Sequence, residues 1–422
     1  MNCKVDKSNL TGTITCPPNK SYTHRAIFLA SLVNGKSLVK NVLHSRDTNA
    51  TIEICKRLGA EIQEAGSNLK IKGIDRFDET DLTLDAFNSG TTIRIAAAIS
   101  SLRNAKTVLT GDESLKKRPM MQLLDALESL GAKCSSNEGK PPLTVVGKIT
   151  GGEITIPGNV SSQFVSALFI AGPLTEKGIT VNISSDLVSK PYLDATISTM
   201  KKFGVEVLDV EPYKKYRIEP QEYKHATVTI PSDFSSVALL LSAAVLVGRN
   251  LTVKVSIGDL AQGDEAIIDI LGKLGVNISM NNNTIRVQSP EQLLGGKFDL
   301  SNTPDLLPPL AILALKCAFP LELYNVRHAR FKETDRIAIL ARELKKLGIG
   351  VTEKEDGMIL THPTELKGAS LDSEDDHRLF MAFCIAAMYV GNCTVSDPES
   401  VDVSYPNFIT DMNHVGARIS TK

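Results

Sequence analysis

The residues best suited to carry chemistry lie in the stretch Lys332–Arg336, whose sequence is KETDR. It places two cations beside two carboxylates, so it offers both proton-transfer groups and charges that bind anions. The apolar residues that follow recur at three- and four-residue steps, which predicts an amphipathic helix capped by Thr334 or Asp335 and ended by Gly348. We expect that helix to open with the charged cluster in about one turn, where its N-terminus favours anions. By itself, such a charged cluster more often belongs to a solvated surface helix, so assigning it a function depends on the rest of the chain.

The elements that must position this stretch are repeated along the chain. Six times, a helical pattern ends in an apolar residue and a glycine and then returns into an apolar segment. Each glycine suits the left-handed position after a helix, and the residues that follow suit a strand. Because successive glycines lie 68 to 73 residues apart, the pattern indicates a repeated supersecondary unit. The glycines are Gly59, Gly131, Gly204, Gly275, Gly348 and Gly416.

Each repeat also contains a second helical pattern that is apolar nearly all round, which is typical of a buried helix. With one inner helix, one outer helix and short strands, a repeat has roughly the order β-α-β-α-β-β. We therefore predict an α/β fold with two domains of three repeats: residues 14–228 form one, and residues 1–13 with 229–422 form the other. The buried helices are expected at residues 26–33, 93–102, 164–174, 237–247, 306–317 and 379–390.

Polar residues that suit helix caps precede every one of these buried helices. Capping alone, however, does not require cations such as Lys20, Arg25 or Arg378. If the three inner helices of a domain point the same way, their positive ends converge on one face. Two such faces would suit polyanionic substrates.

Composition excludes several classes of protein. The chain has 422 residues, 42% of them hydrophobic and 23% charged, and its net charge is −1. It carries no basic surplus and no apolar run of membrane-spanning length, so we expect neither nucleic acid nor a membrane as a partner. The N-terminal segment lacks the apolar core of a signal peptide. The seven cysteines are scattered and never spaced Cys-x-x-Cys, which favours a reducing cytoplasm without a metal site or a disulfide framework.

Seven motifs, in order along essentially the whole chain, resemble the 3-phosphoshikimate 1-carboxyvinyltransferase (EPSP synthase) family of enolpyruvyl transferases. The resemblance implies two inverted α/β barrels, each with buried parallel helices inside outer sheets, and an active site in the cleft between them. The motifs are Lys20-Ser21-x-x-x-Arg25, Asn88-x-Gly90-Thr91, Arg118-Pro119, Ser161-Ser162-Gln163, Ser189-Lys190-Pro191-Tyr192, Lys332–Arg336 and Asp376-His377-Arg378.

The resemblance also implies the reaction, which belongs to the shikimate pathway and leads to chorismate and the aromatic amino acids. The 5-hydroxyl of shikimate 3-phosphate attacks C2 of phosphoenolpyruvate while C3 is protonated, and the tetrahedral intermediate then loses phosphate. No cofactor is implied. Both substrates carry a phosphate and a carboxylate, for which guanidinium groups and backbone donors are suitable binders.

By the same resemblance, Asp305 takes the proton from the 5-hydroxyl, while Glu333 and Lys332 handle the proton at C3. Which of these two protonates C3 stays open, and His377 is at least as well explained as a residue that orients Arg378. Shikimate 3-phosphate would be held by Ser21, Arg25, Ser161, Ser162, Gln163 and Ser189, with Tyr192 and His328 beside it. Phosphoenolpyruvate would be held by Lys20, Gly90, Arg118, Arg336 and Arg378, near Asp305 and Lys332.

Three positions depart from the family pattern. Val403 stands where the family has a lysine two residues before an aromatic-Pro pair, so one contact to phosphoenolpyruvate is missing or supplied elsewhere. His328 stands where an asparagine is usual, and Ser89 where an alanine is common. Serine is small enough to leave the loop geometry intact.

Other functions suit the same kind of fold. The sister enzyme that acts on UDP-N-acetylglucosamine uses a cysteine before an Arg-Pro pair, whereas residues 111–119 contain none. A non-catalytic anion-binding protein would not need both Asp305 and Glu333, and an RNA-end cyclase would be expected to show a basic surplus. We therefore expect a cytoplasmic monomer that binds shikimate 3-phosphate and phosphoenolpyruvate without a metal or cofactor.

Overall fold

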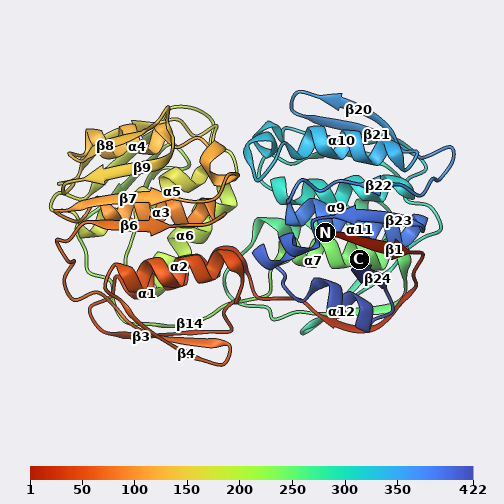
Figure 1. Cartoon of the computed structure of the whole chain (residues 1–422), viewed down its shortest axis with the longest axis horizontal. Coiled ribbons are helices and arrows are strands. Elements are labelled where there is room, and N and C mark those ends of the chain that lie inside the picture. The colour runs from red at the N-terminus through yellow and green to blue at the C-terminus, as the bar shows by residue number, and fades with distance from the viewer. Residues whose placement is uncertain (422) are drawn as a thin grey trace. The chain divides into compact units, whose positions relative to one another are not determined.

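The computed structural model describes residues 1–421, which divide into two units (Figure 1). Unit 1 comprises Met1–Pro17 and Pro231–Lys422, and unit 2 comprises Pro18–Ile230. The division lies a few residues beyond the boundaries expected at 14 and 228. The reason is strand pairing, since β2 (Leu10–Thr15) pairs with β15 (Gly248–Lys254) in unit 1 and β14 (Thr227–Thr229) pairs with β3 (Lys36–Lys40) in unit 2.

Within residues 18–230, unit 2 contains three four-stranded sheets of one topology. In each, the first two strands are parallel, and the third strand in spatial order runs antiparallel to both of its neighbours. The sheets are β14-β3-β5 (Asn68–Lys72)-β4 (Glu61–Ala65), β6 (Leu82–Asp85)-β7 (Lys106–Thr110)-β9 (Lys140–Val146)-β8 (Lys133–Asn137), and β10 (Gly152–Ile156)-β11 (Ile179–Ile183)-β13 (Lys215–Ile218)-β12 (Leu208–Glu211).

The described part of unit 1 repeats this topology in three further sheets. The N-terminal segment takes part in two of them, because β2 lies parallel to β15 while β1 lies antiparallel between β23 and β24. The sheets are β2-β15-β17 (Thr284–Gln288)-β16 (Asn277–Asn281), β18 (Gly296–Asp299)-β19 (Leu321–Tyr324)-β21 (Gly357–Thr361)-β20 (Gly350–Lys354), and β22 (Ser370–Leu371)-β23 (Cys393–Ser396)-β1 (Asn2–Asp6)-β24 (Arg418–Thr421).

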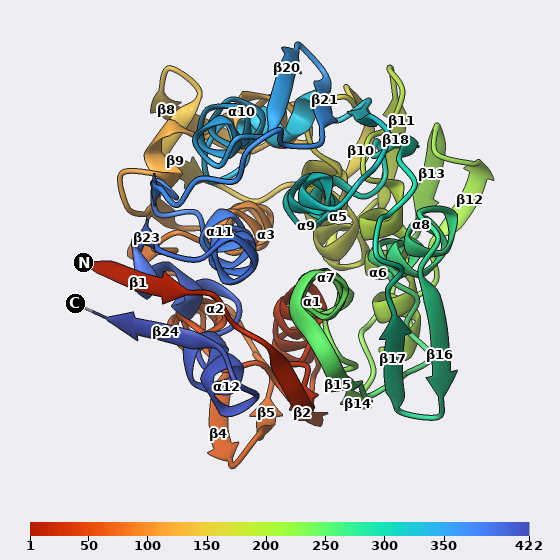
Figure 2. The same cartoon turned by 90° about the vertical axis from the view of Figure 1, so that its right-hand side faces the viewer.

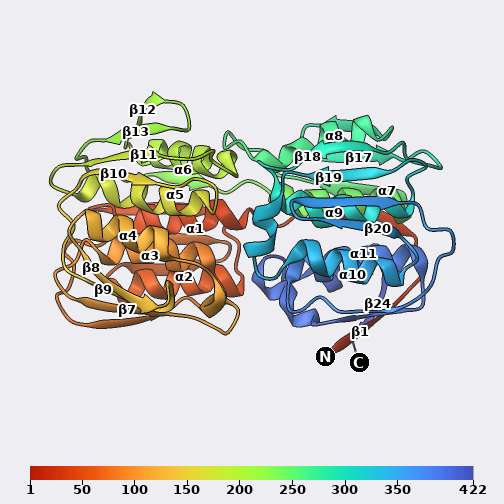
Figure 3. The same cartoon turned by 90° about the horizontal axis from the view of Figure 1, so that it is seen from above.

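The predicted inner helices are buried almost completely. Every residue of α7 is buried, and α3 and α5 are buried except at Thr91 and Gln163 respectively. A helix without a polar face must be covered on all sides, and the sheets of each unit provide that cover. Figure 2 shows α7, α9 and α11 nearly end-on among the strands of unit 1, and Figure 3 shows α1, α3 and α5 side by side in unit 2. The inner helices are α1 (Lys20–Ser31), α3 (Gly90–Ser100), α5 (Ser162–Ala171), α7 (Phe234–Val247), α9 (Leu307–Ala311) and α11 (His377–Val390).

The fifth buried helix, expected at residues 306–317, is wrong as a single α-helix. The chain there forms the 3-10 turn η4 (Pro304–Leu306), the short helix α9 and the 3-10 turn η5 (Ile312–Leu315). Pro304, Pro308 and Pro309 lack the backbone N–H that a regular helix needs, so the segment tightens into short pieces. As a result, Asp305 lies in a 3-10 turn ahead of the helix.

The outer helices end as predicted, and the mixed α/β class is confirmed. All six glycines of the repeat adopt positive φ, from +75° at Gly204 to +114° at Gly59. At Gly348 a Cβ would also lie 2.0 Å from the backbone oxygen of Glu365, so this position requires glycine for two reasons. The outer helices are α2 (Arg46–Arg57), α4 (Met121–Ser129), α6 (Lys190–Lys202), α8 (Ile267–Lys273), α10 (Arg336–Lys346) and α12 (Phe408–His414).

Short 3-10 turns complete the chain. Among the residues that the structure describes, we find no helix with both the length and the apolar character needed to cross a membrane. All seven cysteines lie within the described residues and are free. The remaining 3-10 turns are η1 (Leu115–Lys117), η2 (Gly172–Leu174), η3 (Gly263–Ala266), η6 (Arg327–Phe331) and η7 (Pro398–Val403).

Candidate active site

The first turns of α1, α2 and α3 lie together at one end of unit 2. Lys20 Nζ of α1 lies 3.0 Å from Asp47 Oδ2 of α2. One turn further along, the hydroxyl oxygens of Thr51 in α2 and Thr92 in α3 are 2.7 Å apart. Because these contacts join residues near the start of each helix, the three helix N-termini point toward the same end of the unit.

Two more helices begin at this same end. The Gln163 side-chain amide of α5 donates to Thr91 Oγ1 of α3 at 3.2 Å. Thr196 Oγ1 of α6 in turn donates to Ser166 Oγ of α5 at 2.9 Å. The N-terminal turns of α1, α2, α3, α5 and α6 are therefore joined by side-chain contacts, which concentrates the positive ends of five helix dipoles in one region of unit 2.

The caps of these five helices are uncharged. Asn19, Ser45, Ser89 and Ser161 each accept a hydrogen bond from a backbone N–H of the first turn. Ser189 precedes α6 in the left-handed conformation, with φ of 56°. An uncharged cap satisfies a backbone donor without cancelling the field of the helix, so this end of unit 2 favours anions.

Arg25 holds several of the residues predicted to bind shikimate 3-phosphate. It is buried, and its guanidinium donates to the backbone oxygen and hydroxyl of Ser21, to Tyr192 O at 2.9 Å and to Thr196 Oγ1 at 2.8 Å. Burial lowers the pKa of Arg25 to about 10, which leaves the side chain charged at neutral pH. The structure thus brings Ser21, Arg25 and Tyr192 together through hydrogen bonds.

Gly90 begins α3 beside two guanidinium groups. Arg118 Nη2 donates to Asn88 Oδ1 at 2.8 Å, and Arg94 Nη1 donates to Gln163 Oε1 at 2.5 Å. A Cβ added at Gly90 would lie 2.9 Å from Arg94 Nη1 and 3.0 Å from Arg118 Nη1. The sequence analysis missed Arg94, although an arginine within a helix that is otherwise apolar was an available signal.

In unit 1, the centre of the candidate site is Arg336, whose side chain is completely buried. Its Nε donates to Asp376 Oδ2, its Nη1 to Asp305 Oδ1 and its Nη2 to Glu333 Oε2, each at 2.7 Å. Burial disfavours the charged guanidinium, but Asp376, Glu333 and Asp305 outweigh this effect and raise the pKa of Arg336. Arg336 is therefore a permanent cation that holds the two predicted proton-transfer carboxylates in place. Asp376, like Arg94, is a residue to which the sequence analysis assigned no role.

Asp305 lies among three cations. Its Oδ1 is 2.7 Å from Arg336 Nη1, 3.4 Å from Arg378 Nε and 3.8 Å from Lys332 Nζ. Burial lowers the pKa of Lys332, against the attraction of Asp305, so this lysine gives up its proton more readily than an exposed one. All the catalytic residues predicted from the sequence thus lie within one partly buried cluster of unit 1.

Lys332 and Glu333 lie in a loop between η6 and α10, so the expectation that they open the helix is wrong. The helix begins at Arg336, and Asp335 caps it by accepting a hydrogen bond from a first-turn N–H at 3.0 Å. A cap residue has a non-helical backbone conformation, so the residues before Asp335 are not part of the helix. Their orientation is set instead by contacts with Asp305 and Arg336.

The helix ends of unit 1 carry acids, in contrast to the neutral caps of unit 2. Asp376 caps α11 by accepting from the backbone N–H of Arg378 at 2.9 Å, and Asp233 precedes α7. These carboxylates offset the positive helix ends. The two units therefore differ in their caps: the helix caps of unit 2 are neutral, whereas unit 1 places carboxylates at its helix ends and has Lys332, Arg336 and Arg378 around Asp305.

Comparison with known proteins decides the family. The model of the family described as EPSP synthase (3-phosphoshikimate 1-carboxyvinyltransferase) matches residues 5–412. The chain belongs to the EPSP synthase family. It is 62% identical over 419 residues to the 3-phosphoshikimate 1-carboxyvinyltransferase of Nitrosopumilus maritimus, with 99% of each chain covered.

More distant members of the family support the same assignment. The chain is 40% identical over 426 residues to the 3-phosphoshikimate 1-carboxyvinyltransferase of Methanosphaera stadtmanae, covering 98% of this chain and 99% of the relative. It superimposes on the EPSP synthase of Acinetobacter baumannii with a TM-score of 0.81, at 25% identity and with both chains covered completely. The predicted family and the enzyme class, an enolpyruvyl transferase, are confirmed. Membership in the EPSP synthase family argues against the three alternative functions. These are the UDP-N-acetylglucosamine enzyme, a non-catalytic anion-binding protein and an RNA-end cyclase.

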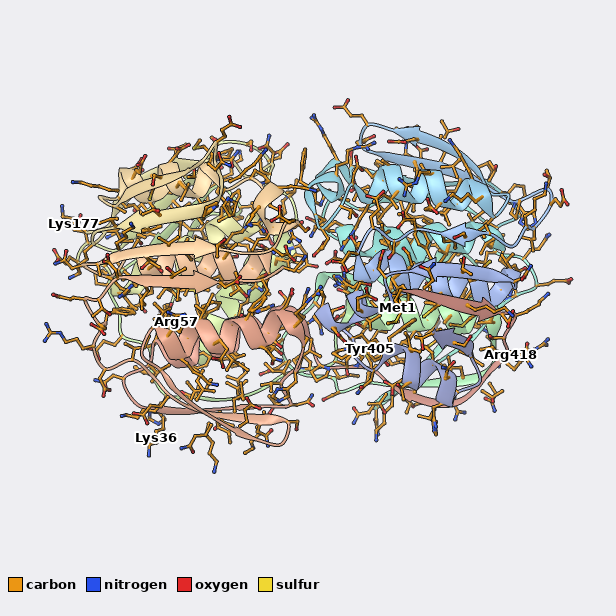
Figure 4. All side chains as sticks on the ribbon, viewed as in Figure 1. Met1, Lys36, Arg57, Lys177, Tyr405 and Arg418 are labelled. Atoms are coloured by element: carbon orange, nitrogen blue, oxygen red, sulfur yellow. The ribbon has the colours of Figure 1, made fainter. Side chains whose placement is uncertain are left out.

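All three departures from the EPSP synthase pattern are buried. Val403 is buried near Tyr405, which Figure 4 labels, so this position cannot supply the cationic contact of the family's lysine. Burial, followed by the positive charge of Lys332, lowers the pKa of His328 to about 4. His328 is therefore neutral at pH 7, and like the family's asparagine it carries both hydrogen-bonding roles without a charge.

Gly90→Ala is expected to raise the KM for phosphoenolpyruvate about 10- to 100-fold, the equivalent of one charged hydrogen bond. The added methyl would displace the ends of Arg94 and Arg118, which are flexible, so the protein should still fold. Gly272→Ala is the matched control, because a Cβ at Gly272 in α8 meets nothing within 4 Å. Steady-state kinetics test this expectation, and an unchanged KM in Gly90→Ala would show that phosphoenolpyruvate does not approach α3.

Proposed function

We propose that this member of the EPSP synthase family transfers the enolpyruvyl group of phosphoenolpyruvate to the 5-hydroxyl of shikimate 3-phosphate and releases phosphate. The observation that carries the proposal is the difference between the residues gathered in unit 2 and those gathered in unit 1. Unit 2 gathers five helix N-termini with cations, as a doubly anionic substrate requires, and unit 1 gathers Asp305, Glu333 and Lys332 around Arg336, as a reaction with two proton transfers requires.

For shikimate 3-phosphate, the proposed ligands are hydroxyls, backbone donors and Arg25. Ser161 and Ser162 begin α5, and Ser189 precedes α6, so their backbone N–H groups add to the hydroxyls as phosphate donors. Arg25 supplies the fixed positive charge, held by Ser21 and the backbone of α6. For phosphoenolpyruvate, the proposed ligands are Lys20, Gly90, Arg118, Arg336 and Arg378.

The proposed chemistry begins at Asp305. As the oxygen of the 5-hydroxyl forms its bond to C2 of phosphoenolpyruvate, Asp305 accepts the hydroxyl proton, and its Oδ1 is positioned by Arg336, Arg378 and Lys332 within 4 Å. The electron pair of the C2–C3 double bond takes a proton at C3 from Lys332 or Glu333. In the second half the same group removes a proton from C3, the double bond forms again, and the C2–O bond to phosphate breaks.

The proposed function is tested by phosphate release. We expect release to require both shikimate 3-phosphate and phosphoenolpyruvate, with one phosphate formed for each enol ether detected by mass spectrometry. UDP-N-acetylglucosamine serves as the control acceptor and should give none. Release with phosphoenolpyruvate alone, or with the control acceptor, would contradict the assignment.

Lys332→Arg is expected to lower kcat by about 10²-fold or more, because arginine keeps the charge but does not give up a proton. In the parent, kcat should fall as pH rises through the lowered pKa of Lys332, below the ordinary value of 10.5. The variant should lose this alkaline limb. Lys316→Arg is the control, since burial also lowers the pKa of Lys316 but outside the site. An alkaline limb that survives in Lys332→Arg would assign the titration to another group.

We also propose that the enzyme acts in the cytoplasm as a monomer. The seven free cysteines support a reducing compartment. Light scattering on the purified protein tests the oligomeric state, and a mass of two chains or more would refute the monomer.

A further inference from the structure

His24 lies in the interior of unit 2, on the second turn of α1, and it is completely buried. Its Nδ1 lies 2.7 Å from Thr51 Oγ1 of α2, whereas its Nε2 has no hydrogen-bond partner among the described residues. Burial, and then the positive charges of Lys20 and Arg25, hold the pKa of His24 well below its usual value of 6.5. The imidazole is therefore neutral at neutral pH, and only one of its two ring nitrogens carries a hydrogen.

Three hydroxyl groups continue from His24 to the start of α3. Thr51 Oγ1 lies 2.7 Å from Thr92 Oγ1, and Thr92 Oγ1 donates to Ser89 Oγ at 2.6 Å. Ser89 caps α3, because its Oγ also accepts from the backbone N–H of Thr92 at 3.2 Å. All four side chains are completely buried, and they join α1, α2 and α3 in one unbroken chain of hydrogen bonds.

The direction of this chain follows from its last link, since a hydroxyl has a single hydrogen to donate. Thr92 donates its hydrogen to Ser89, so it accepts from Thr51. Thr51 has then used its own hydrogen, so it accepts from the Nδ1–H of His24. This assignment leaves the unpartnered Nε2 as a lone pair, which costs less in buried surroundings than an orphaned N–H donor.

The chain of hydroxyls ends directly before Gly90, at a position where the family pattern commonly has alanine. The serine here supplies a side-chain acceptor that alanine lacks, and it holds the cap of α3 at φ −81° and ψ 101°. Lys20 lies one turn before His24 on α1, and Gly90 follows Ser89 at the start of α3. The chain therefore connects the starts of two helices that carry proposed ligands of phosphoenolpyruvate.

From these contacts we propose that His24 is a positioning residue that fixes the start of α3 for the binding of phosphoenolpyruvate. Its Nδ1–H orients the two threonine hydroxyls, and these orient the cap that precedes Gly90. This deepens the proposed function and rests on it. His24 is completely buried, so it acts through the placement of α3 relative to α1. The expected effect is therefore on the KM for phosphoenolpyruvate, with kcat close to that of the parent.

Steady-state kinetics compare His24→Leu with His24→Asn. Leucine has a similar volume but no donor, whereas asparagine keeps an N–H close to the position of Nδ1. We expect His24→Leu to raise the KM for phosphoenolpyruvate about 3- to 10-fold, the equivalent of one hydrogen bond, and His24→Asn to stay within about twofold of the parent. A parental KM in His24→Leu, equal effects of the two variants, or an equal rise in the KM for shikimate 3-phosphate would overturn the proposal.

A double-mutant cycle of Thr51→Val with Ser89→Ala tests the chain in variants that keep His24. Because both substitutions interrupt the same chain, their combined effect on the KM for phosphoenolpyruvate should be at least about threefold smaller than the product of the single effects. Thr199→Val is the matched control, since its buried hydroxyl donates at 2.6 Å to Ala195 O within its own helix, and it should leave this KM unchanged. Strictly multiplicative effects of Thr51→Val and Ser89→Ala would overturn the proposal.

Nitrogen NMR of protein that carries isotope-labelled histidine tests the direction of the chain directly. Among the seven histidines, the signals of His24 are those that disappear in His24→Asn. We expect a hydrogen on Nδ1 and a bare Nε2 at neutral pH. A hydrogen on Nε2 would overturn the proposal, because Nδ1 would then accept from Thr51 and the chain would run the other way. The measurement needs no substrate, so its outcome is independent of which transfer the enzyme catalyses.

Discussion

Asp305→Asn is expected to lower kcat by about 10²–10⁴-fold, the usual contribution of a general base, while both KM values stay near those of the parent. The asparagine side chain has the same shape and keeps an oxygen that can accept from Arg336 Nη1, now 2.7 Å from the carboxylate. The fold should therefore survive. Binding should not weaken, because the substitution removes a negative charge from a site for anionic substrates.

The contrast between kcat and KM identifies the role of Asp305. Pre-steady-state phosphate release measures the chemical step directly, and Asp402→Asn, on an exposed aspartate of η7, is the control for the substitution itself. If Asp305→Asn kept near-parental turnover, or changed only KM, Asp305 would be a binding or structural residue. Glu333, which accepts from the other terminal nitrogen of Arg336, would then be the next candidate for the base.

Arg336→Met is expected to destabilise unit 1 by about 3–5 kcal/mol, the cost typical of removing one partner from a buried ionic cluster. The substitution leaves Asp305, Glu333 and Asp376 buried without the guanidinium that each contacts at 2.7 Å. Methionine fills a similar volume, so the loss of stability should arise mainly from the removal of the charge. We also expect the KM for phosphoenolpyruvate to rise, because the substitution removes a cation from the site.

The pH dependence of this loss separates charge from packing. In the parent, burial disfavours the charged guanidinium, but Asp376, Glu333 and Asp305 raise the pKa of Arg336, so it stays charged from pH 5 to pH 8. In the variant, the three carboxylates lose this cation, and a buried carboxylate that loses its cation favours the protonated form, so the stability of the variant should fall as pH rises. The difference between parent and variant should therefore be larger at pH 8 than at pH 5.

Urea unfolding followed by circular dichroism measures this difference at the two pH values. Arg327→Met is the matched control, because Arg327 pairs with Glu355 at the surface at 3.2 Å and an exposed pair contributes little. A loss of stability that is the same at pH 5 and pH 8 would contradict the electrostatic account and indicate a packing defect.

The sequence by itself determined the features that depend on neighbouring residues. The periodic glycines located the ends of the outer helices, because the position after a helix calls for positive φ wherever it lies in the fold. The apolar helices revealed the inner layer, since a helix without a polar face must be covered on all sides. The motifs around Lys20, Gly90 and Lys332 indicated the family, which the comparisons confirm.

Only the tertiary structure decided how charges far apart in the sequence combine. Arg336 contacts Asp376 forty residues away, and Arg94 contacts Gln163 sixty-nine residues away. No local sequence period indicates which helix ends share a face. The effect of the neutral caps of unit 2 and of the acidic caps of unit 1 could therefore be assessed only in the folded structure. The electrostatic character of a helix end depends on every charge packed around it, and that packing is a property of the folded chain.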